Sequence, residues 1–190
     1  MKNKKTVLIL ILVFVLLLGG AYALYTQLGS KLTANQLATS QTDAGDAQKA
    51  IAPDFTVYDA DGGEVRLSTY IGKPIVLNFW ASWCGPCRTE MPDFHKVYQE
   101  IGNDVQFLMI NMTDGSRETV EIASSFVAQQ GYTFPVFYDT KAAAASAYGA
   151  YALPTTFFID AQGYVVAQAR GMIDHDTLLR GIEMIAPQGE

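Results

Sequence analysis

The pattern of apolar and polar positions along the chain predicts a series of short strands and helices. Short runs rich in apolar or β-branched residues predict strands over 55–58, 65–67, 75–80, 105–110, 136–138, 155–159 and 164–169. Apolar residues at helical spacing or a helix-favouring composition predict helices over 88–101, 114–131, 142–148 and 174–185. Strands that alternate with helices and close in a hairpin and a last helix predict an α/β fold. We expect a three-layer sandwich with a mixed central sheet, helices on both faces and an N-terminal hairpin.

Residues 1–27 have a different pattern from the rest of the chain. A lysine-rich start, residues 2–5, precedes an apolar run over residues 7–18, as in a signal peptide. The uncharged stretch 6–27 is also long enough to cross a bilayer, which takes about 20 residues. Residues 21–23 resemble a signal cleavage site, so a cleaved signal peptide and a retained signal anchor both stay open. In either case the positive flank predicts that the remainder lies outside the cytoplasm, tethered to the cell membrane by one span or released.

Composition divides the remainder into a linker and a folded domain. Residues 28–50 are rich in Gln, Thr, Ser, Ala and Asp and contain no aromatic residue, which predicts a flexible linker. Residues 51–188 then form the domain. From Thr6 onward, ten basic and nineteen acidic residues give a net charge of −9. An acidic domain argues against nucleic acid as a partner, because that interaction requires a basic face.

The candidate chemistry lies in Trp83–Cys87, which holds the only two cysteines of the chain. The motif follows a predicted buried strand and precedes a predicted helix. A thiol at a helix N-terminus is favoured as the thiolate, which makes Cys84 the candidate nucleophile. Cys87, one turn further on, is the candidate resolving thiol. Gly85 and Pro86 suit a first helical turn, since the missing proline N–H would be unpaired there anyway.

Two other roles for the cysteines are less favoured. A structural zinc site needs about four nitrogen or sulfur ligands, and beyond the cysteines only the distant His95 and His175 could supply nitrogen. A purely structural disulfide between cysteines that have only two residues between them would close almost no loop. We therefore expect dithiol–disulfide chemistry, with no metal and no cofactor.

The motif and its surroundings resemble a known family. Trp83–Cys87 directly after Asn78–Ser82 is similar to the thioredoxin superfamily. The segments Arg88–Pro92 and Leu153–Thr156 narrow the resemblance to membrane-tethered, extracytoplasmic thiol-disulfide reductases of the ResA/TlpA type, over residues 52–186. The resemblance implies a thioredoxin-like sandwich.

It also implies roles for residues outside the cysteine pair. Pro154 stands at the superfamily's cis-proline position, where the backbone of Leu153 would pair with an extended client segment. Spacing alone favours an exposed helical carboxylate for Glu90, whereas the resemblance implies a role in proton handling. Asn78 stands where general thioredoxins carry a buried aspartate, and an amide cannot titrate.

The surface that meets the client is expected to include Trp83, Gly85, Pro86 and Leu153. For Trp83, a partly exposed lid over the sulfurs is favoured, and plain core packing is the alternative.

The predicted function is an extracytoplasmic thiol-disulfide oxidoreductase that acts mainly as a reductase. Its expected partners are a membrane thiol-disulfide electron donor and a client protein with a disulfide. By resemblance, the client includes the haem-attachment Cys-x-x-Cys-His of apocytochrome c. The alternatives are a disulfide oxidant or isomerase, a peroxidase, and a thioredoxin-like metal carrier or binding module.

Overall fold

The computed structural model describes residues 9–14, 16–20, 37–39 and 50–186. The chain divides into an N-terminal unit and a C-terminal unit that begins at Ala34. Each unit is described by itself.

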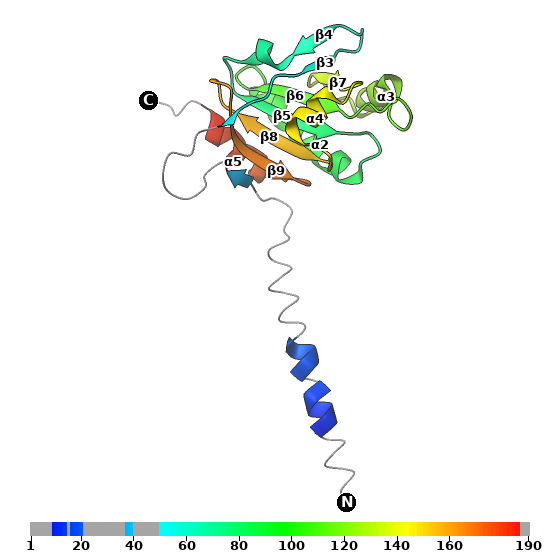
Figure 1. Ribbon diagram of the computed structural model, residues 1–190, viewed down its shortest axis with the longest axis vertical. Helices are drawn as coiled ribbons and strands as arrows, with labels where there is room; N and C mark the ends of the chain where they lie inside the picture. The colour runs from blue at the N-terminus through cyan, green and yellow to red at the C-terminus, as the bar shows by residue number, and fades with distance from the viewer. Residues whose placement is uncertain (1–8, 15, 21–36, 40–49, 187–190) are drawn as a thin grey trace, which may run out of the picture. The chain divides into compact units, whose positions relative to one another are not determined.

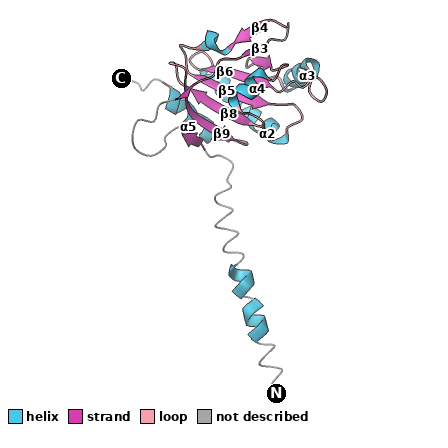
Figure 2. Ribbon diagram, in the orientation of Figure 1, coloured by secondary structure: helices cyan, strands magenta, loops and turns pink. Residues whose placement is uncertain are grey.

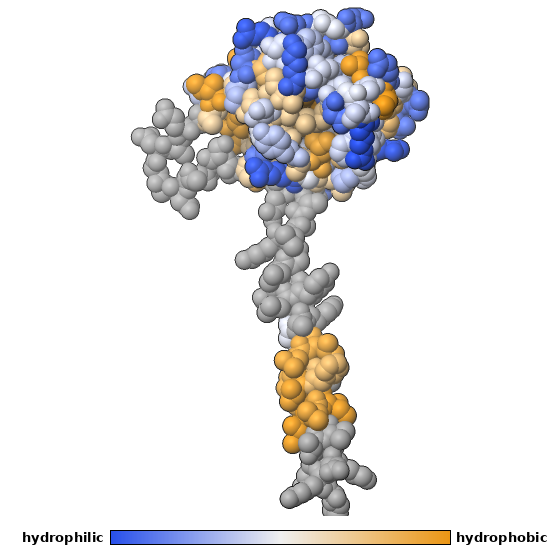
Figure 3. All heavy atoms as spheres, turned by 45° about the vertical axis from the view of Figure 1, so that its right-hand side comes forward, coloured by the Kyte–Doolittle hydropathy of each residue, from blue (hydrophilic) through white to orange (hydrophobic). Residues whose placement is uncertain are grey.

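The described residues of the N-terminal unit, 9–14 and 16–20, are helical. Nearly all of them are apolar, as Figure 3 shows, and their side chains are exposed. Within the described ranges, no helix has both the length and the apolar character that a membrane crossing requires. Much of the predicted signal segment, residues 1–27, lies outside the described residues.

The C-terminal unit is built on one mixed sheet (Figures 1 and 2). Its described strands are β1 (Leu37–Thr39), β2 (Ala50–Ile51), β3 (Thr56–Tyr58), β4 (Glu64–Arg66), β5 (Ile75–Trp80), β6 (Gln106–Asn111), β7 (Val136–Tyr138), β8 (Thr155–Ile159) and β9 (Tyr164–Arg170). The strand order is β1-β9-β8-β5-β6-β7-β3-β4, and β2 also pairs with β9. The pairs β5–β6 and β6–β7 are parallel, and the others are antiparallel. The mixed sheet and the N-terminal hairpin of β3 and β4 are thus confirmed.

Helices cover both faces of this sheet and complete three layers. They are η1 (Leu67–Tyr70), α2 (Gly85–Ile101), α3 (Val120–Gln130), α4 (Ala143–Tyr148) and α5 (His175–Ile185). Buried residues of α2, α3 and α5 form one apolar cluster with one face of the sheet. Leu67 of η1 and the buried residues of α4 belong to a second cluster on the other face.

Strand β5 lies at the centre and is buried at every position. Its alternate side chains point to opposite faces. Val76 and Trp80 belong to the cluster below α2, while Leu77 and Phe79 belong to the cluster on the α4 side. The Asn78 side chain points to the same face as Val76 and Trp80, so the strand places a polar side chain under α2.

Two helices begin three or more residues from their predicted start. Helix α2 starts at Gly85 rather than at residue 88, because Cys84 caps it and Gly85 and Pro86 fit its first turn. Helix α3 starts at Val120, with Thr119 as its cap. The preceding predicted residues instead form a turn, in which Asp114 Oδ1 accepts the backbone N–H groups of the three residues from 116 to 118.

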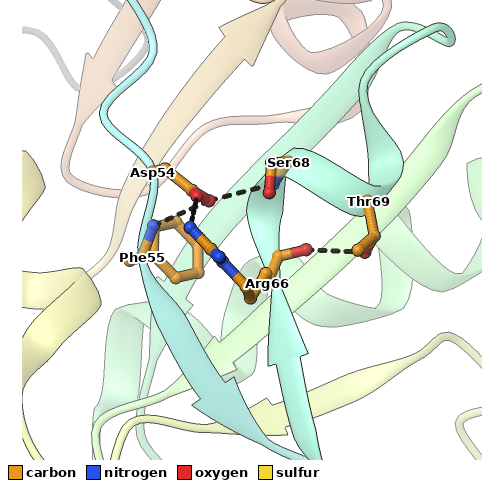
Figure 4. A network of polar contacts seen from close by, with 5 residues as sticks. All are labelled: Asp54, Phe55, Arg66, Ser68 and Thr69. Atoms are coloured by element: carbon orange, nitrogen blue, oxygen red, sulfur yellow. Dashed lines mark hydrogen bonds and ion pairs between the residues drawn. The ribbon is translucent and has the colours of Figure 1, made fainter.

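A carboxylate holds the N-terminal hairpin in place (Figure 4). Asp54 accepts hydrogen bonds from the backbone N–H groups of Phe55 and Ser68 and pairs with the guanidinium of Arg66. The hydroxyl of Thr69 donates to the Arg66 carbonyl oxygen. These contacts connect the chain before β3 to β4 and η1.

The segment predicted as a linker includes strand residues. Leu37–Thr39 and Ala50–Ile51 pair antiparallel with β9, at the edge of the sheet. The rest of residues 28–50 lies outside the described ranges, and the linker stays a prediction.

Candidate functional site

The two cysteines form a disulfide at the N-terminus of α2. Cys84 is the N-cap residue, and its Sγ accepts the backbone N–H of Cys87 at 3.2 Å. Cys84 is 4% exposed and Cys87 is fully buried. Of the two cysteines, Cys84 is therefore the one that a partner can reach. The helix N-terminus beside it favours a negative charge.

A hollow of about 520 Å³ lies beside the disulfide. Its wall is formed by residues of the redox motif, the segment after β6 and the segment before β8: Trp83, Cys84, Gly85, Pro86, Met112, Asp114, Arg117, Tyr151 and Leu153. Trp83 is 42% exposed, as expected for a lid rather than a core residue. The Leu153–Pro154 peptide is cis, as predicted, and Pro154 itself is buried. The hollow thus brings together Trp83, Gly85, Pro86 and Leu153.

Glu90 is buried, so the expectation from spacing that it is an exposed carboxylate is wrong. It is 1% exposed on the inner face of α2, one turn after Cys87. Its Oε1 accepts from Asn78 Nδ2 at 2.9 Å, and its Oε2 accepts the backbone N–H of Ile173 at 3.0 Å. Burial raises the pKa of Glu90 to about 8, although the hydrogen bonds from Ile173 and Asn78 act in the opposite direction.

Asn78 connects this carboxyl group to the sheet. Its Nδ2 also donates to Thr156 Oγ1 at 3.0 Å, across the antiparallel pair of β5 and β8. Its Oδ1 is buried without a hydrogen-bond partner among the described residues. The polar residue at the centre of β5 therefore contacts the acid one turn beyond the disulfide.

A second buried carboxylate, bonded to the loop before Cys84, was not anticipated from the sequence. Glu118 is fully buried, and its Oε1 accepts from the Ser82 backbone N–H at 2.7 Å and from Asn111 Nδ2 at 2.6 Å. Its Oε2 accepts the Ser82 hydroxyl at 2.6 Å. No local pattern distinguishes Glu118 from the other charged residues around it, because its donors come from β6 and from the loop after β5.

The two histidines lie apart from the disulfide hollow. His95 is half-buried and its Nε2 lies 3.1 Å from Thr133 Oγ1. His175 is half-buried at the start of α5. Within the part of the chain that the structure describes, no three His, Cys, Asp or Glu side chains are grouped to hold a metal ion.

A thioredoxin-like sheet with a Cys-x-x-Cys disulfide at a helix N-terminus defines the class of thiol-disulfide oxidoreductases. The chain belongs to the AhpC/TSA family, whose model matches residues 49–168.

Known relatives and structures agree with this assignment. The thiol-disulfide oxidoreductase ResA of Geobacillus thermodenitrificans is 33% identical over 189 residues, which cover 98% of this chain and 99% of that protein. ResA of Bacillus subtilis is 32% identical over 137 residues, covering 72% and 74%. A solved thiol:disulfide interchange protein of the thioredoxin family from Chlorobium tepidum has a TM-score of 0.64 and 28% identity, covering 74% of this chain and 99% of its own. The protein is a thiol-disulfide oxidoreductase of the ResA type that uses the Cys84–Cys87 pair.

Proposed function

We propose that the protein is a membrane-tethered, extracytoplasmic reductase of protein disulfides. The observation that carries this proposal is the Cys84–Cys87 pair at a helix N-terminus, with a buried acid one turn away. The N-terminal lysines and apolar run support the tether, and the match to the Geobacillus ResA extends over almost the whole chain. Residues 51–188 form the extracytoplasmic domain.

The reaction begins with the Cys84 thiolate. It attacks one sulfur of the client disulfide, which forms a mixed disulfide and releases the other client sulfur as a thiolate. Cys87, as a thiolate, then attacks Cys84 Sγ, which releases the second client sulfur and closes the Cys84–Cys87 disulfide. Two electrons pass to the client, and the client thiolates take up protons. A membrane dithiol donor restores the reduced pair.

Glu90 handles the proton of the resolving step. Cys87 is fully buried, so its thiol has no direct path to water when it must ionise. Glu90 lies one helical turn away on the same helix, and its pKa of about 8 makes it a suitable acceptor near neutral pH. Asn78 holds the acid in place.

The client binds along the hollow. Leu153 offers its backbone to an extended client segment, and the buried ring of Pro154 neither donates a backbone hydrogen bond nor reacts with the sulfurs. Trp83, Gly85 and Pro86 contact the client next to the reacting sulfur. The client class is a protein with an accessible disulfide, and the oxidised haem-attachment Cys-x-x-Cys-His of apocytochrome c is the candidate.

Trapping tests this function. Cys87→Ala should accumulate a mixed disulfide with a peptide that carries an oxidised Cys-x-x-Cys-His, because the resolving thiol is gone. Cys84→Ala serves as the matched control and should not form the adduct. Reduced parent protein should convert the same peptide to its dithiol. Absence of both the adduct and peptide reduction would refute the proposal.

The tether has a separate test. In intact cells, a thiol reagent that does not cross membranes should label the reduced cysteines, and the protein should stay with the membrane fraction. Protection from the reagent would contradict an extracytoplasmic domain.

A further inference from the structure

We propose that Glu118 is a positioning residue of the redox site, which fixes the loop before Cys84 and holds a negative charge there that favours the disulfide over the dithiol. This inference rests on the proposed role of Cys84 as the attacking thiolate. In this role, Glu118 makes the reduced Cys84–Cys87 pair a better electron donor.

Glu118 holds the redox loop through both of its oxygens. Ser82 donates its backbone N–H to Oε1 and its hydroxyl to Oε2, at 2.7 and 2.6 Å. The loop is itself a tight turn, in which the Cys84 backbone N–H donates to the Ala81 carbonyl oxygen at 3.1 Å. A bidentate contact at Ser82 therefore restricts the backbone that positions the reactive sulfur.

The carboxyl group receives only donors. Asn111 Nδ2 adds a third hydrogen bond, at 2.6 Å, to the two from Ser82. An ionised carboxylate accepts hydrogen bonds and does not donate them, and all three contacts to this fully buried group come from donors. Among the described residues, no cationic side chain forms an ion pair with Glu118.

The neighbouring residue holds the same loop from outside. The Arg117 guanidinium lies 3.8 Å from the centre of the Trp83 ring. Two consecutive residues before α3 thus contact two consecutive residues of the redox loop: Glu118 contacts Ser82 from the interior, and Arg117 covers Trp83 at the surface. Through these two contacts, the segment after β6 holds the redox loop in position.

The charge acts on the redox equilibrium. Reduction of the disulfide adds two electrons and two protons, and at working pH the Cys84 thiol then releases a proton to become the thiolate. The Glu118 carboxylate contacts Ser82, which stands two residues before Cys84 in the chain. A buried charge is screened far less than one in water. It therefore disfavours the thiolate and hence the reduced protein.

Other charged and titratable groups also face Cys84. Asp114 and Arg117 after β6 and the Tyr151 phenol before β8 line the hollow beside Cys84. Arg88 and Glu90 lie on α2, the helix that Cys84 caps, where Arg88 lies over the Phe126 ring and Glu90 bonds to Asn78 and Ile173. Backbone hydrogen bonds, that from Glu118 first, lower the pKa of Asp114, so its charge is constant near neutral pH. The variants below leave all of these groups in place.

The test compares Glu118→Gln with Asp139→Asn. Asp139 is also a buried carboxylate, 3% exposed, but it accepts the N–H groups of Ala144 and Ala145 at the start of α4. Each protein is equilibrated with reduced and oxidised dithiothreitol, and the Cys84–Cys87 state is read from the mass after alkylation. Iodoacetamide rates across pH give the ionisation of Cys84.

For Glu118→Gln we expect the equilibrium to shift about tenfold toward the reduced protein, equivalent to about 30 mV. Alkylation should become fast about one pH unit lower than in the parent. Asp139→Asn should stay within twofold of the parent. If the two variants behave alike, the proposal is overturned.

Glu118→Asp covers the case in which Glu118→Gln does not fold. It keeps the charge but is one methylene shorter, so the equilibrium should stay within threefold of the parent while hydrogen exchange at the Ser82 N–H becomes faster. A tenfold shift in this variant, or unchanged exchange, would contradict the proposal. Each variant is compared with the parent protein, so these results do not depend on the absolute reduction potential of the parent. A failure here would therefore overturn the role of Glu118 without bearing on the trapping test of the proposed function.

Discussion

Two buried carboxyl groups flank the redox loop, and they differ in how many donors reach them. Glu90, on α2, accepts two N–H groups, one from a side-chain amide and one from the backbone. Glu118, before α3, accepts a hydroxyl, a backbone N–H and a side-chain amide N–H. Both are almost completely shielded from water.

The difference indicates that burial alone does not decide what a carboxyl group does. With two donors, desolvation is the larger effect on Glu90 and raises its pKa to about 8. Such a group gains and loses a proton near neutral pH. Three donors, one of them a hydroxyl, reach Glu118, to which we assign a positioning role beside the redox loop. The same residue type is thus assigned two different roles at one redox site.

The largest expected effect is on turnover. Glu90→Gln removes the proton acceptor and keeps the shape, so client reduction at pH 7–8 should fall by about 1000-fold, within the usual range for loss of general acid–base catalysis. Glu100→Gln, at an exposed position of the same helix, is the control and should keep parental turnover. Stopped-flow reduction of a disulfide peptide measures both. If Glu90→Gln reduced the client at the parental rate, Glu90 would not be the proton acceptor.

Stability should change with pH in a direction set by Glu90. Its pKa in the folded protein, about 8, lies above the ordinary 4.5, so the folded state holds more protons than the unfolded chain between these values. Stability therefore falls as pH rises from about 4.5 to 8, by a few kcal/mol.

Glu90→Gln should abolish most of this decline. Denaturant unfolding of the oxidised proteins at several pH values measures it, and the gain of the variant over the parent should be largest above pH 8 and vanish near pH 4. A gain of the same size at every pH would contradict the assigned shift.

The contact of Ser82 with Glu118 should contribute less to the free energy of unfolding than the ionisation of Glu90 does. Ser82→Ala removes one hydrogen bond to a charged group, which lowers the free energy of unfolding by about 1.5 kcal/mol. Ser146→Ala, at an exposed position of α4, is the control and should lie within about 0.5 kcal/mol of the parent. If chemical denaturation gives equal values for the two variants, the contact at Ser82 is not a support.

The smallest effect should come from Arg117. Arg117→Gln removes the cation over Trp83 and should destabilise by about 0.5 to 1 kcal/mol. Acrylamide quenching of tryptophan fluorescence should increase, since Trp83 is partly exposed and Trp80 is fully buried. Lys141→Gln removes a cation over Tyr58 and should leave quenching unchanged. Equal quenching in both variants would show that Arg117 does not cover the ring.

The sequence predicts the features that depend on local pattern. The apolar run of β5 and the cysteine spacing are each carried by a few neighbouring residues, which were sufficient to predict the central strand and the disulfide site. The cis peptide before Pro154 was predicted from the resemblance of Leu153–Thr156 to the thioredoxin superfamily. The predicted start of α3 was wrong because an aspartate can begin a turn as readily as a helix. Here Asp114 accepts the backbone N–H groups of a turn.

The two carboxyl environments depend instead on contacts between distant segments. Glu90 is buried because the chain before α5, 83 residues further on, supplies a backbone donor. Glu118 lies 36 residues after Ser82 and meets it only once β5 and β6 are paired. Spacing along one helix or loop cannot reveal such partners.

The most direct test of the account is the reduction potential of the Cys84–Cys87 pair in the parent protein, measured by equilibration with dithiothreitol and mass analysis after alkylation. The account predicts reversible interconversion with a midpoint near or below the roughly −270 mV of thioredoxin. A midpoint near the roughly −120 mV of a strong oxidant such as DsbA, or a pair that never interconverts, would contradict it.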